Sequence, residues 1–143
     1  MKISDDVANV LGNSQMEFIY IAGPYRAEHP YQVAANVRRA RDVADEVALM
    51  GYFPIVPHTM TAHMDGIQDD KFWLDGTLEL MDRAADIVVM LPGSAYSQGA
   101  QEERNAALAK ELPVYYWPYD KDLLMARCRG NERRGSYGNN RKN

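Results

Sequence analysis

The chain has 143 residues, of which 46% are hydrophobic and 25% charged, with a formal net charge of −4 and one cysteine, Cys128. These values are typical of a single globular domain. A lone cysteine excludes an internal disulfide framework. No apolar run reaches the length of about 18 residues that a membrane span needs, and the first residues lack the pattern of a secretory signal. We therefore expect a cytoplasmic protein that does not enter a membrane. Its negative charge gives no reason to expect nucleic-acid binding.

The two ends of the chain differ in composition from its middle. Residues 127–143 hold six Lys or Arg and one Glu, and they are rich in Gly and Asn. Such a segment buries too little apolar surface to fold, so we expect it to be disordered. The alternative is that it binds a phosphate or a partner subunit. We predict an N-terminal extension or short helix at 1–16, an α/β domain at 17–128 and a basic, disordered tail at 129–143.

Strand-like and helix-like patterns alternate along the domain. Apolar runs that stop at Gly or Pro predict strands, and apolar residues three and four apart predict helices. The predicted elements are strand 17–22, helix 31–50, strand 52–56, loop 58–68, helix 70–84, strand 86–91, helix 99–111, strand 114–117 and helix 121–128.

This alternation predicts a fold class. Crossovers of about 30 residues between strands favour a parallel sheet with helices on both faces. A reversal of direction after the second strand gives the strand order 2-1-3-4 of a single-domain flavodoxin-like, or Rossmann-like, fold. The ligand crevice of such a fold opens between the first and third strands, at their carboxyl ends.

Two segments are expected beside that crevice. Phe18-Ile-Tyr-Ile-Ala-Gly-Pro-Tyr-Arg26 is an apolar strand that stops at Gly-Pro, and 86–103 is a strand, a polar loop and a helix with a carboxylate in its first turns. The free backbone N–H groups at such a helix start favour an anion. Glu103 is then either a charge that complements the helix dipole or a catalytic group.

Together these segments carry a family resemblance. Tyr-Ile-Ala-Gly-Pro-Tyr at 20–25, Ala85-Asp86 at the start of a strand, and Ser97-x-Gly99-x-x-x-Glu103 resemble the nucleoside 2-deoxyribosyltransferase superfamily over roughly residues 18–117. The superfamily includes base-exchanging transferases and hydrolases that cleave the N-glycosidic bond of 2'-deoxynucleoside 5'-monophosphates. The resemblance implies an enzyme without a cofactor. It also implies a homo-oligomer, most simply a dimer, in which a neighbouring subunit helps close the site.

The resemblance assigns the catalytic carboxylate to Glu103. N-glycosidic cleavage passes through an oxocarbenium-like sugar, which needs a carboxylate beneath the anomeric carbon. Glu102 lies about 100° further round the helix, so the two cannot face one pocket. We interpret Glu102 as a solvent-facing charge. Tyr20, in the first strand, is expected to hydrogen-bond Glu103 or orient the nucleophile, and the alternative is a half-buried core tyrosine.

Four further residues are candidates for substrate binding. Gly23 lets the backbone pass close to a ligand, with a plain turn as the alternative. Arg26 lies where the monophosphate hydrolases place a phosphate-binding arginine, and a solvated loop arginine is the other interpretation. Ser97 aligns with a phosphate-contacting serine and, with the N–H groups of Gly99 and Ala100, forms a candidate anion cradle. A helix-capping serine is compatible with that role.

One position departs from the superfamily pattern. Members usually have an Asp eight residues before the Asp that opens the third strand, and this chain has Leu78 there. Asp75 and Asp82 lie on the same helical face as Leu78. Asp75 is closer to the expected ligand edge, so we predict it as the second catalytic carboxylate. Asp70 is a candidate cap of this helix.

The histidines do not predict a metal site. His58 and His63 lie in one loop near Asp65, but Cys128 is remote and structural zinc needs four ligands in a tight pattern. We expect no metal. His58 follows the second strand directly, so it either lines the base pocket or is a loop histidine with its hydrogen bonds satisfied.

These observations predict an N-glycosidase that acts on a (deoxy)nucleoside 5'-monophosphate, because Arg26 and Ser97 both favour a phosphate. The alternatives are a deoxyribosyltransferase acting on unphosphorylated nucleosides, a nucleotide-binding or sensing module without activity, and a NAD-cleaving hydrolase of the TIR type. In the expected dimer, the helices that flank the pocket meet the second subunit through Trp73, Met81 and Leu108.

Overall fold

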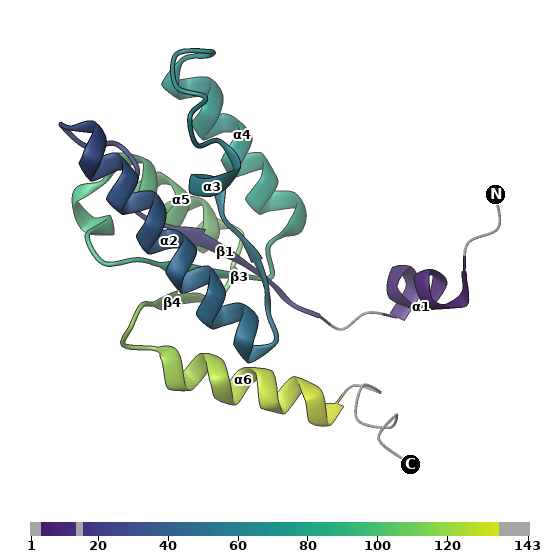
Figure 1. Ribbon diagram of the computed structural model, residues 1–143. Helices are drawn as coiled ribbons and strands as arrows, with labels where there is room; N and C mark the ends of the chain where they lie inside the picture. Colours follow the sequence, from purple (N-terminus) through teal and green to yellow (C-terminus); the bar gives the residue numbers. More distant parts are fainter. Residues whose placement is uncertain (1–3, 14–15, 135–143) are drawn as a thin grey trace.

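Four short parallel strands form the centre of the molecule (Figure 1). The computed structural model describes residues 4–13 and 16–134. The strands are β1 (Phe18–Ala22), β2 (Phe53–Ile55), β3 (Ile87–Met90) and β4 (Val114–Tyr116). They pair in the order β2-β1-β3-β4, all parallel. The predicted α/β class and strand order are confirmed, so the reversal point lies between β1 and β3.

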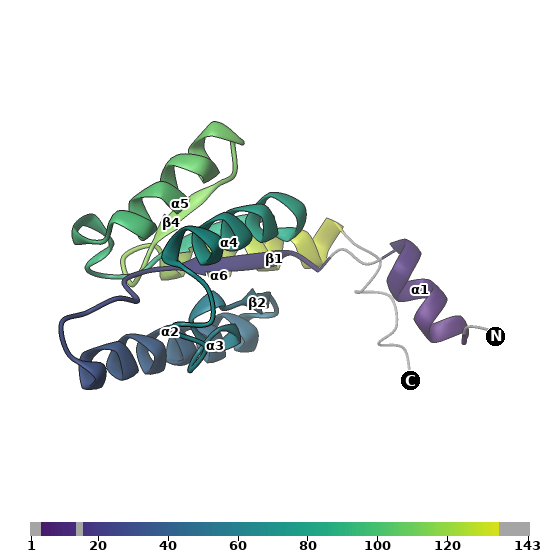
Figure 2. The ribbon, with the colours of Figure 1, turned by 90° about the horizontal axis from the view of Figure 1, so that it is seen from above.

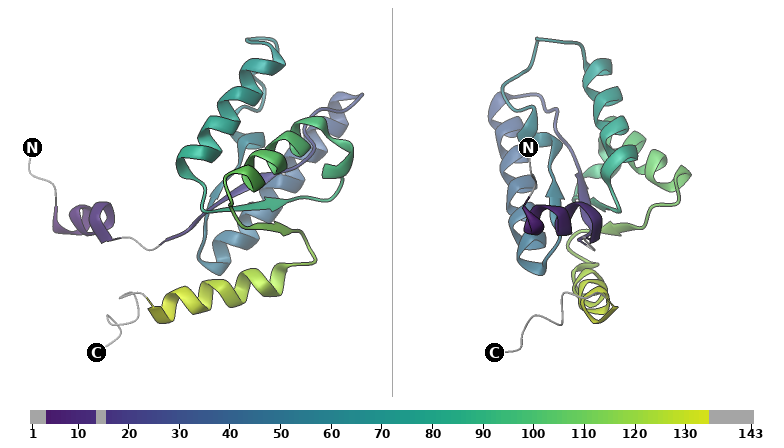
Figure 3. Two further views of the ribbon diagram at one scale, coloured as in Figure 1. Left: turned by 180° about the vertical axis from the view of Figure 1, so that it is seen from behind. Right: turned by 90° about the vertical axis from the view of Figure 1, so that its right-hand side faces the viewer.

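The helices follow the predicted pattern with a few differences. They are α1 (Asp5–Asn13), α2 (Pro30–Met50), α3 (Pro57–Met60), α4 (Asp70–Ala84), α5 (Gln98–Ala109) and α6 (Lys121–Arg134), and a 3₁₀ turn, η1, covers Ser94–Tyr96. Neither α3 nor η1 was predicted, because a single helical turn carries no periodic signal. In Figures 1 and 2 and in the left view of Figure 3, α1 lies apart from the sheet and its covering helices.

α6 continues six residues beyond its predicted end at Cys128. The middle of this helix is hydrogen-bonded to Glu17, the residue before β1. The Arg127 guanidinium donates two hydrogen bonds to the Glu17 carboxylate, at 3.0 and 2.7 Å, and the Asn131 amide donates to the same group. Residues 129–134 are therefore helix, where a disordered tail was predicted. The rest of the predicted tail, 135–143, lies outside the described residues.

Helices cover both faces of the sheet (Figure 2). Side chains alternate between the two faces along a strand, and in β1 this sends Ile19 and Ile21 into a core formed with α2 and α6. Tyr20 and Ala22 enter a second core formed with α4 and α5. The candidate residue Tyr20 therefore faces α4 and α5, on the opposite side of the sheet from α2.

The carboxyl ends of β1 and β3 lie in close contact. Leu91 N–H donates to the Ala22 carbonyl at 2.8 Å, which extends the pairing of the two strands. A Cβ built on Gly23 would lie 2.8 Å from the Leu91 Cβ. Position 23 therefore needs glycine because of this packing. Neither a turn nor a ligand, the two alternatives predicted from sequence, is required to explain it.

Candidate functional site

Glu103 is buried in the second turn of α5. Only 8% of this residue is exposed, and α5 contacts both α4 and β1. Burial raises the pKa of the Glu103 carboxyl from its ordinary 4.5 to about 7, and the interaction with the Tyr20 phenol opposes this rise. Perturbed carboxyl groups of this kind are typical of catalytic sites. The structure therefore brings together Glu103 and Tyr20, as predicted.

Tyr20 is the fully buried partner of this carboxylate. Burial, followed by the negative charge of Glu103, raises the pKa of the phenol well above its usual range, so Tyr20 stays protonated. Within the described part of the chain, no hydrogen bond of ordinary geometry reaches the Tyr20 hydroxyl. A buried hydroxyl without a hydrogen bond costs free energy, which makes Tyr20 a candidate site residue.

Thr77 of α4 is the third polar residue at this position, and sequence analysis missed it. Its side chain lowers the pKa of Tyr20 and so opposes the effect of burial. Thr77 lies four residues before the buried Met81, so both are on the inward face of α4. The spacing of the two residues is the signal that could have identified Thr77.

Asp75, the predicted second carboxylate, lies elsewhere on α4. Its side chain is exposed and forms a hydrogen-bonded ion pair with Lys71, one turn earlier. Asp75 lies two positions before Thr77, which places them about 200° apart round the helix. Since Thr77 faces Tyr20, Asp75 points away from it, and the structure does not bring Asp75 to Glu103. The cap of this helix is Asp69, which accepts from Phe72 N–H at 2.8 Å, and not the candidate Asp70.

Ser97 and Gly99 lie at the start of α5. The Ser97 hydroxyl accepts a hydrogen bond from Ala100 N–H at 3.3 Å and so caps the helix. A Cβ at Gly99 would meet nothing within 4 Å, so no packing requires a glycine there. The same helix start carries Glu103 in its next turn. The predicted anion cradle at Ser97, Gly99 and Ala100 therefore lies one helical turn from the buried carboxylate.

His58 is a buried residue of α3. Its Nε2 lies 3.1 Å from the Gly23 carbonyl oxygen and 3.0 Å from that of Pro24, so the ring donates to the loop after β1. Burial lowers the pKa of His58, and the ring is neutral near pH 7. Nδ1 is then an acceptor, and it is buried without a partner in the described residues. His58 anchors the loop after β1, and base binding stays a prediction.

Arg26 is held by two carboxylates. Its side chain is 53% exposed and forms ion pairs with Asp65, at 3.3 Å, and with Asp70 at the start of α4. The guanidinium carbon also lies 5.5 Å from the centre of the Tyr25 ring. The Tyr25 hydroxyl donates to Asp65 as well, at 3.2 Å. Arg26 is therefore ion-paired in this structure, an arrangement that the sequence did not indicate.

Comparison with known families identifies the chain. A family model described as a domain of unknown function, DUF7768, matches residues 17–117. The chain belongs to this family. No curated protein matches the sequence. The matched part of the DUF7768 domain runs from the residue before β1 to the residue after β4 and contains every candidate site residue. The description carries no activity, so the resemblance to deoxyribosyltransferases remains a prediction.

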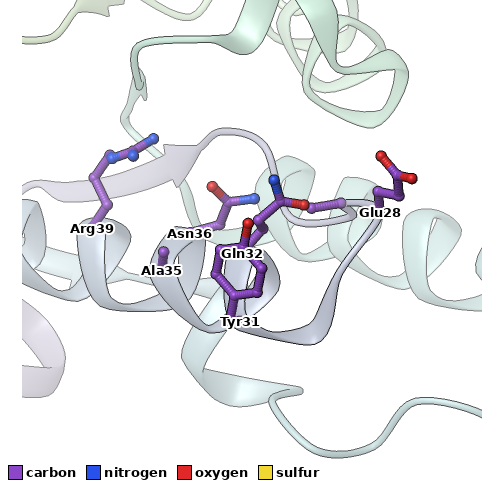
Figure 4. Close-up of a pocket in the computed structure, with 7 residues that line it drawn as sticks. Glu28, Tyr31, Gln32, Ala35, Asn36 and Arg39 are labelled. Carbon is purple, nitrogen blue, oxygen red and sulfur yellow. The ribbon is translucent and has the colours of Figure 1, made fainter.

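A separate hollow lies on α2 of the DUF7768 domain (Figure 4). Its volume is about 500 Å³, and it contains none of the predicted site residues. The residues that line it belong to the loop before α2 and to α2 itself: Ala27, Glu28, Tyr31, Gln32, Ala35, Asn36 and Arg39. Because α2 and α5 cover opposite faces of the sheet, this hollow is distinct from the Glu103 cluster.

Two further properties concern only the described residues. No helix among them is long and apolar enough to cross a membrane. No group of three or more His, Cys, Asp or Glu side chains gathers there in a way that could hold a metal ion.

Proposed function

We propose that this chain cleaves the N-glycosidic bond of a (deoxy)nucleoside 5'-monophosphate and releases the free base. The burial of the Glu103 carboxyl beside the Tyr20 phenol, close to the switch point of a parallel sheet, carries this proposal. Ligands of open α/β sheets bind at that point. A carboxylate with a displaced pKa is the group that N-glycosidic chemistry requires.

In this proposal Glu103 acts in its ionised form. With a pKa of about 7, a large share of the carboxyl is ionised at neutral pH although it is buried. The carboxylate either attacks the anomeric carbon, forming a glycosyl ester as the bond to the base breaks, or stabilises the cationic sugar while water attacks. A poorly hydrated carboxylate is effective in both roles, because the surroundings screen its charge weakly.

Tyr20 has a positioning role in this proposal. Its phenol remains protonated, because burial and the charge of Glu103 both raise its pKa. A protonated phenol can donate to the ionised carboxylate and hold one oxygen, which leaves the other free for the sugar. The Thr77 side chain lowers the pKa of the phenol, and its hydroxyl donates to the Leu74 carbonyl at 3.1 Å.

The phosphate end of the substrate is proposed to lie at the start of α5 and at Arg26. A helix start offers free N–H groups to an anion, and Ser97 and Gly99 stand there. A guanidinium binds phosphate through two parallel hydrogen bonds. The distance from the helix start to Glu103 is about one turn, which suits the separation of a 5'-phosphate from the anomeric carbon.

A second candidate is base transfer between unphosphorylated nucleosides. The ion pairs of Arg26 with Asp65 and Asp70 favour it, because an arginine already neutralised attracts phosphate less strongly. If the chain is a transferase, Glu103 keeps the same role, and a second base attacks the anomeric carbon in place of water.

We also propose a symmetric homo-oligomer with its contact at α4 and α5. Leu108 and Phe72 of these helices are large and about half exposed, and a shallow site is commonly completed by a second subunit. Met81, one of the residues predicted for this contact, is buried within the subunit itself and cannot take part. Its spacing on α4 fits the core as well as a contact, which is why the sequence could not separate the two.

A mass-spectrometric screen tests the proposed function. The purified chain is incubated with each nucleoside and 5'-monophosphate, with and without a second free base, and Glu103→Gln is the control. Release of base from monophosphates supports hydrolysis, and exchange among nucleosides supports the transferase. Binding of a nucleotide without release of its base would favour a sensing module. Release of nicotinamide from NAD would favour a NAD-cleaving hydrolase of the TIR type.

A further inference from the structure

The segment between α3 and α4, residues 61–69, is attached to the loop after β1 mainly through side chains. Its own backbone hydrogen bonds are local: Met64 N–H donates to Thr61 at 3.1 Å, and Ile67 N–H to Met64 at 3.3 Å. Its side-chain links to the β1–α2 loop converge on Asp65, which accepts from Tyr25 and pairs with Arg26.

Arg26 is thus the centre of a small cluster of opposite charges. Asp65 approaches one terminal nitrogen of the guanidinium and Asp70 approaches the other. The two carboxylates together outweigh the single positive charge, so the cluster carries a net charge of −1. All of these side chains are about half exposed or more, and exposed ion pairs of this kind hold their partners weakly.

We propose that Asp65 and Asp70 determine how strongly the site selects phosphorylated substrates. This inference rests on the proposed function, in which Arg26 meets the 5'-phosphate. The two carboxylates pair with the guanidinium in this structure, and an incoming phosphate takes their place. Asp65 then leaves Arg26, and the 61–69 segment loses its ionic link to the β1–α2 loop.

Charge and geometry both support competition. A phosphate and a carboxylate use the same N–H groups of a guanidinium, so Arg26 cannot hold Asp65, Asp70 and a phosphate at full strength together. A phosphate that approaches also meets two negative charges. Asp65 and Asp70 therefore lower the affinity for a phosphorylated ligand and leave an uncharged ligand unaffected.

The test compares two small probes, 2-deoxyribose 5-phosphate and 2-deoxyribose, by calorimetry on the full chain. Asp65→Asn keeps the shape and the acceptor for Tyr25 but removes the charge. We expect it to tighten binding of the sugar phosphate about two- to fivefold, the range for one exposed ion pair, without changing binding of the sugar. Glu79→Gln is the matched control, because it removes an equal charge from an exposed ion pair on α4, with Arg83.

Hydrogen exchange gives a second measurement. In the wild type, the sugar phosphate should speed exchange of backbone amides in 61–69; in Asp65→Asn exchange should already be fast and insensitive to the probe. Unchanged or weaker binding of the sugar phosphate by Asp65→Asn would overturn the inference, as would the absence of binding by both proteins. Base release by the wild type is measured separately. Release with no effect of Asp65→Asn rejects only the inference, and tighter binding without any release rejects only the proposed function.

Discussion

The Glu103 cluster and the Arg26 cluster show two ways of holding charge in one small domain. Glu103 lies in the core between α5, α4 and β1, where burial raises its pKa to about 7. Arg26 lies at the surface and is neutralised by Asp65 and Asp70. Burial shifts the pKa of an ionisable group and so changes its reactivity, whereas an ion pair at the surface is weak and can be exchanged for another partner. In the proposed function the first cluster performs the reaction and the second selects the substrate.

The largest expected effect is on turnover. Glu103→Gln keeps the shape of the side chain but removes the charge that stabilises the cationic sugar, so base release should fall by about two orders of magnitude or more. The control is Glu102→Gln, whose side chain accepts from Gln98 on the helix surface and which should act like the wild type. Equal losses in both variants would contradict the assignment of Glu103.

The same substitution should change stability in a pH-dependent way. Glu103 has a folded pKa of about 7, above its ordinary 4.5, so the folded protein binds more protons than the unfolded chain between these values. The free energy of unfolding should therefore fall as pH rises through this window, with the full cost present above pH 7. Relative to the wild type, Glu103→Gln should gain roughly 2–3 kcal/mol between pH 5 and pH 8.

Urea unfolding at the two pH values measures this difference. Glu102→Gln again serves as the control, and its stability relative to the wild type should not depend on pH in this way. A constant offset between Glu103→Gln and the wild type would mean that the carboxyl is ionised as easily in the folded protein as in the unfolded chain.

Arg26→Ala tests whether the surface cluster binds the phosphate. Loss of a charge-assisted hydrogen bond should weaken binding of a 5'-monophosphate about ten- to a hundredfold, and binding of the unphosphorylated nucleoside hardly at all. Arg41→Ala, which removes an exposed arginine paired with Asp45 on α2, is the control. Equal losses for both ligands would favour the transferase as the function.

The smallest expected effect is at Thr77. Thr77→Val keeps the branched shape but removes a hydroxyl that donates to the Leu74 carbonyl at 3.1 Å and belongs to the side chain that lowers the pKa of Tyr20. Turnover should therefore fall only about two- to tenfold, as expected for the loss of one weak polar interaction. Thr59→Val is the control, because the Thr59 hydroxyl bonds the Val56 carbonyl away from Glu103. An unchanged rate would mean that Tyr20 is oriented by packing alone.

Much of the fold could be predicted from the sequence, because its signals are local. Apolar runs that stop at Gly23-Pro24 and at Pro92-Gly93 mark the ends of β1 and β3. α4 begins and ends where its pattern does. Glu103 was predicted from the family resemblance, which places the catalytic carboxylate six residues after Ser97 and four before Ala107. The structure shows Ser97 as the cap of α5 and both Glu103 and Ala107 on its buried side.

The rest depends on contacts between distant parts of the chain. Asp65 and Asp70 lie some forty residues from Arg26, and nothing in their local sequence indicates that they meet it. Asp75 was chosen by its closeness to Leu78, but α4 turns Thr77 inward because Met81 must reach the core. The Glu17 carboxylate, more than a hundred residues earlier, accepts hydrogen bonds from Arg127 and Asn131 of α6, and the local sequence gives no sign of this contact.

The close packing of Gly23 against Leu91 has a consequence for related sequences. The glycine has no room for a methyl group, because a Cβ would lie within 3 Å of two Leu91 carbons. Because the nearest of these atoms is the Leu91 Cβ itself, an alanine at position 23 should be tolerated only with glycine at position 91, and the two positions should change together. The Gly23→Ala and Leu91→Gly pair should accordingly show rescue: the double variant loses less stability than the two single losses added together.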